Sequence, residues 1–289
     1  MLDCRAAGRE PGLHTPPPNT PMNLLSDSAA LLDEMRRRAP LVHCLTNHVV
    51  TNFTANVLLA AGAAPAMIHD PEESAMFAGV ASALLVNVGT IEREQAEAMR
   101  RAVAAANAAG RPWVLDPVAV GALPLRTQVA AELAVKKPAM IRGNASEILA
   151  LAGAGLGGRG VDSTAGVDAA ADAARVLAES TGAAVLVTGP VDLVAAPGGA
   201  APVRIANGVP LLTRVTGVGC SQGALCAALC AAADGDARLA AVAAALLVGL
   251  AGERAARVSQ RPGSFAVAFL DALDEIDAAA IEAEGKVLA

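Results

Sequence analysis

The chain is poor in aromatic residues. Phe, Trp and Tyr make up only 2% of its 289 residues, and tyrosine is absent, although 54% of the residues are hydrophobic. This excludes a core built on large rings, so the core has to be packed from Ala, Val and Leu. Small side chains of this kind allow helices to approach a sheet and each other closely.

Runs of basic residues are also missing. The chain has 22 Lys and Arg residues against 28 Asp and Glu residues, which gives a formal net charge of −6. A chain of this charge is a poor match for nucleic acids or anionic membranes. The longest apolar stretch, residues 239–252, is too short to span a bilayer and indicates a buried helix. We therefore expect a soluble protein with no nucleic acid and no membrane among its partners.

Disulfide and metal-binding patterns are lacking as well. The five cysteines include no C-x-x-C pair, and the four histidines show no zinc-like pairing with them, so no structural metal site is expected. The odd cysteine count and the lack of a secretory signal indicate free thiols, and we expect a cytoplasmic protein. Cys226 and Cys230 lie four residues apart on one expected helix, where both are interpreted as core residues.

The segment of residues 1–21 differs from the rest of the chain. It contains three consecutive prolines, Pro16, Pro17 and Pro18, and is predicted to be a disordered N-terminal extension. Met22 is an alternative start of the protein. Residues 22–289 contain no repeat and no linker, so we expect a single domain there.

Helical and strand patterns alternate through residues 22–289. Helices are predicted at residues 29–38, 52–61, 93–109, 126–136, 167–181, 222–233, 239–259 and 264–284. Strands are predicted at residues 41–44, 66–68, 83–86, 113–115, 139–141, 184–187, 193–196, 203–205 and 211–214. Fully apolar strands that alternate with helices are typical of a buried, mostly parallel sheet covered on both faces. The last three strands are closely spaced, so the predicted fold class is α/β, with three layers and an antiparallel edge.

Two glycines, Gly217 and Gly219, precede an Ala-rich helix that is expected to begin near Cys220. Glycines permit a tight turn with accessible N–H groups, and a helix start adds unpaired donors and the positive end of its dipole. Together they predict a phosphate site with a thiol at its centre, which indicates phosphoryl transfer. The spacing to Gly223 is one residue too long for G-x-G-x-x-G, and G-x-x-x-x-G-K-[ST] does not occur. The alternative is that the glycines only let a strand turn into a closely packed helix.

Polar residues follow the other parallel strands. These blocks are Thr46-Asn47, Asn87-Val88-Gly89-Thr90, Asp116-Pro117-Val118, Arg142-Gly143-Asn144 with Glu147 close behind, and Thr188-Gly189. Ligands of open α/β sheets bind beyond the carboxyl ends of the strands. Polar residues that recur at these positions, in a chain with only 17% charged residues, favour a functional site over a purely structural turn.

Together the blocks resemble the hydroxyethylthiazole kinase family, a family of thiamine-salvage enzymes with the ribokinase-like fold. The resemblance rests on residues 46–47, 52–56, 87–90, 115–118, 141–147, 215–220 and 262–265, and it runs in the same order from residue 40 to residue 273. It implies that ATP phosphorylates a thiazole alcohol in the presence of Mg²⁺. It also implies a homotrimer with active sites between the subunits.

The resemblance places the thiazole beside Met67, Gly217 and Asn47, although composition alone would assign Met67 to the core. Most ribokinase-like enzymes carry an Asp base after the Gly-x-Gly turn, whereas this chain has Cys220. We expect Cys220 to accept the alcohol proton late, because the loose transition state of phosphoryl transfer needs little activation of the alcohol. A helix N-terminus lowers the pKa of a thiol and a bound polyphosphate raises it, so the protonation state of Cys220 stays open.

The resemblance places the nucleotide beside Arg142, Thr188 and Gly219. Asp116 and Glu147 correspond to an acidic pair near the phosphates and the metal, and Mg²⁺ favours one or two carboxylates together with phosphate oxygens. As alternatives, Asp116 could form an Asx turn, and Glu147 could simply suit the first turn of a helix. Arg142 has no evident acidic neighbour in the sequence, which favours a phosphate contact. Residues 153–166 resemble a family loop beside the nucleotide, although composition alone indicates a flexible connection.

Two other functions stay open at this point. Cys220 could be the nucleophile of a hydrolase, with His43 or His48 as base and the glycine loop as oxyanion hole. Arg142 and the acidic pair would then have no task in acyl transfer. The second alternative is a non-catalytic sensor of thiazole or nucleotide.

Overall fold

The computed structural model describes residues 21–153 and 167–288 of the chain. The predicted N-terminal extension therefore lies outside the described residues, apart from Pro21, with which the first helix begins. The loop that was expected beside the nucleotide also lies outside them, apart from Gly153 at the end of a helix.

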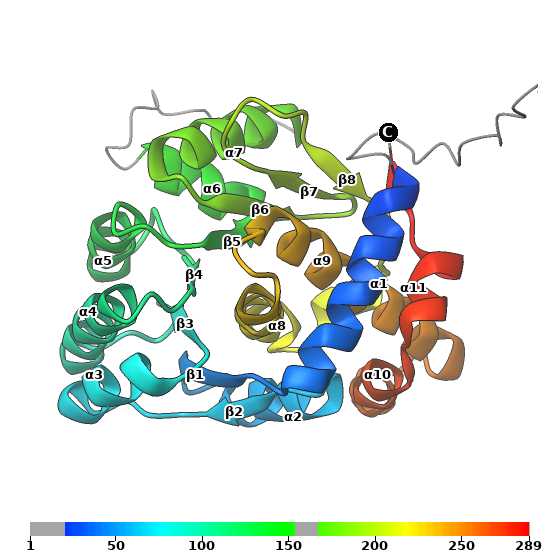
Figure 1. Ribbon diagram of the computed structural model, residues 1–289, viewed down its shortest axis with the longest axis horizontal. Coiled ribbons are helices and arrows are strands. Elements are labelled where there is room, and N and C mark those ends of the chain that lie inside the picture. The colour runs from blue at the N-terminus through cyan, green and yellow to red at the C-terminus, as the bar shows by residue number, and fades with distance from the viewer. Residues whose placement is uncertain (1–20, 154–166, 289) are drawn as a thin grey trace, which may run out of the picture.

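One mixed sheet of nine strands runs through the described part of the chain (Figure 1). Its strands are β1 (Leu41–Leu45), β2 (Ala64–Ala66), β3 (Ala83–Asn87), β4 (Trp113–Asp116), β5 (Met140–Asn144), β6 (Ala184–Thr188), β7 (Asp192–Ala195), β8 (Val203–Ile205) and β9 (Val287–Leu288). The spatial order is β2-β1-β3-β4-β5-β6-β7-β8-β9. Pairing is parallel from β2 to β6 and antiparallel from β6 to β9, which confirms the predicted fold class.

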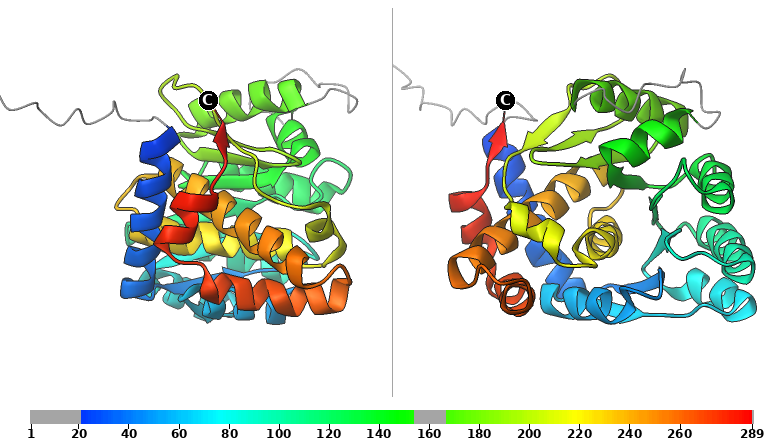
Figure 2. Two further views of the ribbon diagram at one scale, coloured as in Figure 1. Left: turned by 90° about the vertical axis from the view of Figure 1, so that its right-hand side faces the viewer. Right: turned by 180° about the vertical axis from the view of Figure 1, so that it is seen from behind.

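Helices cover both faces of the sheet (Figures 1 and 2). One face carries α3 (Pro71–Val80), α4 (Arg93–Ala108), α5 (Pro124–Ala134), α6 (Ala145–Gly153) and α7 (Val167–Thr181). The other carries α1 (Pro21–Arg38), α2 (Thr51–Ala61), α8 (Val218–Ala232), α9 (Ala237–Val258), α10 (Pro262–Glu275) and α11 (Ala278–Glu284). Each layer packs its own cluster of buried side chains against the sheet, so the structure has the three layers that the sequence predicts.

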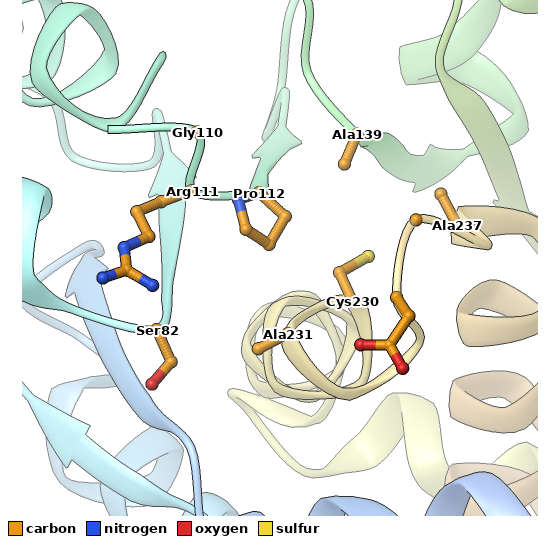
Figure 3. Close-up of a pocket in the computed structure, with 10 residues that line it drawn as sticks. Ser82, Gly110, Arg111, Pro112, Ala139, Cys230, Ala231 and Ala237 are labelled. Carbon is orange, nitrogen blue, oxygen red and sulfur yellow. The ribbon is translucent and has the colours of Figure 1, made fainter. Parts of the chain in front are cut away.

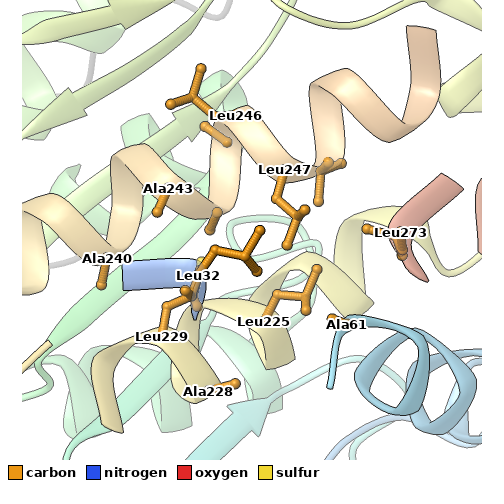
Figure 4. Packing of buried hydrophobic residues seen from close by; sticks show 14 of the residues in the cluster. Leu32, Ala61, Leu225, Ala228, Leu229, Ala240, Ala243, Leu246, Leu247 and Leu273 are labelled. Atoms are coloured by element: carbon orange, nitrogen blue, oxygen red, sulfur yellow. The ribbon is translucent and has the colours of Figure 1, made fainter. Parts of the chain in front are cut away.

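The helices α8 and α9 form the centre of the larger core cluster. Leu32 of α1 meets Leu225 and Leu229 of α8 and Leu247 of α9, while alanines fill the space between the helices (Figure 4). In length and composition α9 could cross a membrane, but 78% of its apolar window is buried inside the protein. It is therefore a core helix, as the sequence predicts for residues 239–252.

Two sequence predictions of local structure are wrong, and three short elements were missed. The strand expected at residues 211–214 is a 3-10 helix, Pro210–Arg214, in which proline occupies the first turn and Leu211 turns into the core. The helix expected at residues 264–284 is interrupted at Ile276, which is extended, and Asp277 caps the next helix by accepting a hydrogen bond from Ala280 N at 2.9 Å. The short elements α3, α6 and β9 were not predicted.

Candidate active site

The polar blocks converge at the carboxyl ends of the parallel strands. Asn87 and Asp116 are the last residues of β3 and β4 and lie opposite each other in the sheet register. Asn144 and Thr188 have the same relation at the ends of β5 and β6. These four residues were expected in loops but are the last residues of their strands, so the sheet fixes their backbones.

The first turn of α8 points its free N–H groups into this region. Gly217 precedes the helix with φ 101°, a left-handed conformation that favours glycine, and no side chain caps the helix start. The first intrahelical bond runs from Ser221 N to Gly217 O at 2.8 Å. The N–H groups of residues 218–220 therefore have no partner four residues back, which leaves them open to an anion.

Cys220 lies in this turn, close to the side-chain amide of Asn47, which follows the carboxyl end of β1. Asn47 Nδ2 donates to Cys220 Sγ over 3.4 Å. Burial and the nearby Asp116 carboxyl raise the pKa of the Cys220 thiol, while hydrogen bonds from Asn87 and Asn47 and the charge of Arg142 oppose this rise. These effects together place the pKa of the Cys220 thiol above its ordinary value, which is the direction that the sequence left open.

Asn87 joins Asn47 to Asp116. Its side-chain oxygen accepts from Asn47 Nδ2 at 3.1 Å and from Gly89 N at 3.0 Å, and its nitrogen donates to Asp116 Oδ2 at 2.7 Å. The orientation of the Asn87 amide is therefore defined by its partners. Asp116 does not form the alternative Asx turn, since its carboxyl reaches across the sheet instead.

Asp116 is fully buried, and its second oxygen has no hydrogen-bond partner among the described residues. The nearest cation is Arg142, whose Nη1 lies 3.8 Å from Asp116 Oδ1. Burial raises the pKa of Asp116 to about 7, the charge of Glu147 adds to the rise, and Arg142 and Asn87 oppose it. An unpaired buried oxygen of this kind is unfavourable by itself and fits a site that receives a cation.

Arg142 stands between the acidic residue and the helix start. It has an acidic neighbour after all, contrary to the interpretation of the sequence. Its Nε donates to Gln222 Oε1 at 3.1 Å, and its Nη2 donates to Thr188 Oγ1 at 3.2 Å. A Cβ added at Gly219 would lie only 3.1 Å from Nη2, so the guanidinium group lies flat against the glycine turn.

Glu147 makes the contacts of a helix start. Asn144 Oδ1 accepts from Glu147 N at 3.0 Å, and Glu147 Oε2 accepts from Asn144 N at 2.8 Å, which is the reciprocal arrangement of a capping box. Glu147 Oε1 also accepts from Ala119 N at 2.9 Å and so joins the loop after β4 to the first turn of α6. The structural role considered for Glu147 is thus present.

Met67, His43 and His48 lie on or just after β1 and β2, at one edge of the sheet. Met67 follows β2 at the edge of the sheet and packs, partly buried, against the larger core cluster. His43 is buried in β1 with Nε2 2.9 Å from Ile68 O, and His48 is exposed. The hydrogen bonds described for Cys220 come from asparagine amides and none from an imidazole, which removes support from the hydrolase alternative.

Three residues of this network had no role in the sequence-based predictions: Asn87, Gln222 and Asp192, whose carboxyl lies beside the side chain of Gln222. Asn87 stood in a recognised polar block, so its position carried a signal. Gln222 appeared only as the start of a predicted helix, and Asp192 lay just before a predicted strand. Their partners come from other elements, and sequence spacing does not show such contacts.

A pocket of about 420 Å³ lies away from these residues, between the loops that precede β3, β4 and β5 and the end of α8 (Figure 3). It is lined by Ser82, Pro112, Ala139 and Cys230, among others. It opens at the amino ends of the strands, whereas ligands of open α/β sheets bind at the carboxyl ends. None of the predicted site residues lines it.

Comparison with known proteins identifies close relatives. A family model described as the hydroxyethylthiazole kinase family matches residues 32–279. The hydroxyethylthiazole kinase of Kineococcus radiotolerans is 54% identical over 268 residues, which cover 93% of this chain and 95% of that protein.

Solved structures agree with this likeness. The hydroxyethylthiazole kinase protein from Pyrococcus horikoshii OT3 superposes with a TM-score of 0.83 at 37% identity, over 90% of this chain and 98% of that chain. A ribokinase-like superfamily protein from Enterococcus faecalis V583 has a TM-score of 0.60 at 10% identity, over 89% of this chain and 95% of that chain. The second likeness concerns the fold alone, and the ribokinase-like fold that we expected is confirmed.

Proposed function

This chain belongs to the hydroxyethylthiazole kinase family, and we propose that it transfers the terminal phosphoryl group of ATP to the hydroxyethyl alcohol of 4-methyl-5-(2-hydroxyethyl)thiazole, in thiamine salvage. One observation carries the proposal: the uncapped first turn of α8 has the Cys220 thiol beside Asn47 and the Arg142 guanidinium group against Gly219. An acceptor alcohol and a phosphate can therefore meet at one helix start.

The phosphate side consists of the free N–H groups of α8, Arg142 and Thr188. Phosphoryl transfer has a loose transition state, so catalysis depends on positioning and on stabilising charge. The N–H group of Gly219 and its neighbours would hold the transferring group, while Arg142 and Thr188 bind the nucleotide phosphates. Support comes from the 3.1 Å approach that a Gly219 Cβ would make to the guanidinium group, since only a glycine leaves this surface open.

Cys220 is proposed as the group that accepts the alcohol proton. Only the thiolate form of Cys220 can take up this proton, and a raised pKa makes that form scarce at neutral pH but more basic when it is present. Because the alcohol loses its proton late and needs little activation, a small thiolate population serves the step. The hydrogen bond from Asn47, made at 3.4 Å already, stabilises this thiolate before it accepts the proton. Asn47, Gly217 and Met67 are proposed to hold the thiazole on the side away from the nucleotide.

Mg²⁺ is proposed to accompany ATP at Asp116, with Glu147 behind it. Oδ1 of Asp116 is fully buried and has no hydrogen-bond partner among the described residues. It is suited to bind the ion directly or through a water molecule, because Mg²⁺ binds through one or two carboxylates and phosphate oxygens. Both Glu147 oxygens already accept backbone N–H groups, so its share is to add negative charge and to hold the loop after β4. When bound, the ion neutralises charge that develops on the phosphates.

A homotrimer with active sites between subunits is proposed from the family. Val49, beside Asn47, is 66% exposed, and Met67 follows an edge strand, so a second subunit would cover apolar surface there. A cytoplasmic location is proposed as well, in line with the free thiols of the four described cysteines. Mass measurement in solution tests the trimer directly.

A coupled assay of ATP consumption tests the function. The thiazole alcohol should support many turnovers with Mg-ATP, whereas hydroxymethylpyrimidine and simple sugars should support few. Binding of thiazole and nucleotide without turnover would instead identify a sensor. Esterase activity that iodoacetamide abolishes, without ATP consumption, would identify the hydrolase.

A further inference from the structure

Every nitrogen of the Arg142 guanidinium group faces a different partner. Nε donates to Gln222 at 3.1 Å, Nη2 donates to Thr188 at 3.2 Å, and Nη1 lies 3.8 Å from Asp116. A guanidinium group has five donors, so at least two remain on the terminal nitrogens for an anion. Because Gln222 of α8 holds Nε, the orientation of the guanidinium group is fixed, and the remaining donors point in one direction.

Gln222 provides the hold on Nε and is itself held. Its side chain is 3% exposed, and it lies on α8 two residues after Cys220. While its oxygen accepts from Arg142, a side-chain hydrogen bond joins it to the carboxyl of Asp192 in β7. An amide suits this position because it accepts from a cation and donates to an anion without carrying charge.

Asp192 extends the connection to the nucleotide side. Its Oδ1 accepts from Gly189 N at 2.9 Å, at the turn that follows Thr188. One chain of hydrogen bonds thus runs from the Thr188–Gly189 turn through Asp192 and Gln222 to Arg142. It joins the strand end that is proposed to bind ATP with the helix that is proposed to bind the transferring group.

We propose that Gln222 is a positioning residue for the nucleotide, which holds Arg142 through Nε and, together with Asp192, holds the Thr188–Gly189 turn in a fixed relation to the start of α8. This inference rests on the proposed function, because it assumes that Arg142 and Thr188 contact ATP. Such a residue preorganises the nucleotide site. A free arginine side chain has about 2 kcal/mol of rotamer entropy to lose, and a side chain that is already fixed loses less on binding.

The test compares Gln222→Met with the wild type. Methionine keeps the length and burial of the side chain but removes both polar contacts. We expect the dissociation constant of a non-hydrolysable ATP analogue and the KM for ATP to rise about tenfold, while the dissociation constant of the thiazole alcohol changes less than about twofold. Calorimetry measures the two dissociation constants, and a thermal melt reports on folding.

Asp192→Ala provides the second variant, because it removes the same chain of hydrogen bonds at its other end. If the two residues act through one connection, the double variant loses less ATP affinity than the product of the two single losses. The positioning role would be overturned if the losses of ATP affinity in the two single variants multiply in the double variant, or if ATP and thiazole lose affinity equally. So would unchanged ATP binding by a folded Gln222→Met protein. A wild-type protein that phosphorylates no thiazole would instead refute the proposed function.

Discussion

Asn87 and Asp116 end neighbouring strands, and Asn87 Nδ2 donates to Asp116 Oδ2 over 2.7 Å. The hydrogen bond fixes one carboxylate oxygen, and the other has no hydrogen-bond partner within residues 21–153 and 167–288. A fully buried carboxyl in this state is destabilising when it is charged. In the proposed kinase this carboxyl supplies negative charge beside the metal and the phosphates, and such a conflict between stability and activity is common.

Replacing Asp116 with Asn is therefore expected to stabilise the protein above neutral pH and to abolish turnover. Burial raises the pKa of Asp116 to about 7, whereas an aspartate in an unfolded chain has a pKa of about 3.9. The native state then holds the proton more tightly, so this group's contribution to stability falls as the pH rises from about 4 to about 7. The gain of the Asn variant should reach at most about 4 kcal/mol at pH 8 and should shrink towards pH 4.

Thermal melts of both proteins between pH 5 and pH 8 measure this gain. Asp271→Asn is the control, because Asp271 lies exposed on α10. A constant difference in Tm between wild type and the Asp116 variant over the whole range would contradict the raised pKa.

Cys220 should react slowly with alkylating agents near neutral pH. Burial and the Asp116 carboxyl raise the pKa of its thiol, and only the thiolate is nucleophilic. We expect the Cys220 peptide to be alkylated by iodoacetamide at pH 8 more slowly than a free model thiol. The rate should rise further only at more alkaline pH. Peptide mapping by mass spectrometry follows the reaction, and fast modification at pH 6 would show that the thiol is ionised.

Substituting Cys220 by Ala should slow turnover by about 10²–10⁴-fold if the thiol accepts the alcohol proton. Thiazole affinity should stay nearly the same, because positioning is left to neighbouring groups. Cys226→Ala is the matched control: Cys226 lies on the same helix but is fully buried in the core. Steady-state kinetics separates kcat from KM, and an unchanged kcat in the Cys220 variant would remove the thiol from that role.

Adding one methyl group at Gly219 should weaken ATP binding. The new Cβ would lie 3.1 Å from Nη2 and 3.2 Å from Nη1 of Arg142, so the guanidinium group has to move. We expect Gly219→Ala to raise the KM for ATP at least several-fold. Gly79→Ala on α3 is a suitable control, since nothing lies within 4 Å of the added atom. A normal KM for ATP in the Gly219 variant would show that the close packing of Gly219 against Arg142 does not contribute to ATP binding.

The sequence predicted β1, β3, β4, β5 and β6 well, because each is a short apolar run that the fold buries. The strand expected at residues 66–68 is displaced, since β2 occupies Ala64–Ala66 at the half-exposed edge of the sheet. The sequence missed α3 and α6, which have only 10 and 9 residues and so show little periodicity. The wrong strand at residues 211–214 had a strand-like composition, but Pro210 and the burial of Leu211 favour a 3-10 turn.

The same division holds within the site. Asn47, Asp116 and Thr188 could be predicted to converge, because parallel strands bring their carboxyl ends to one edge. The partners of Arg142 could not, since they depend on which strands are neighbours and on how side chains turn. A residue such as Gln222, which acts through another side chain, leaves no motif in the sequence.

The alanine-rich packing of α8 against α9 has a consequence for how this protein tolerates change. Replacing an alanine with glycine removes a single methyl group, so few positions there can leave a large cavity. Replacing an alanine with a larger residue forces closely spaced backbones apart. The same holds where α9 packs against the segment after β8, since a Cβ added at Gly249 would lie 2.6 Å from Asn207. Substitutions in this interior are therefore limited mainly by side-chain size: the helices tolerate a smaller side chain better than a larger one.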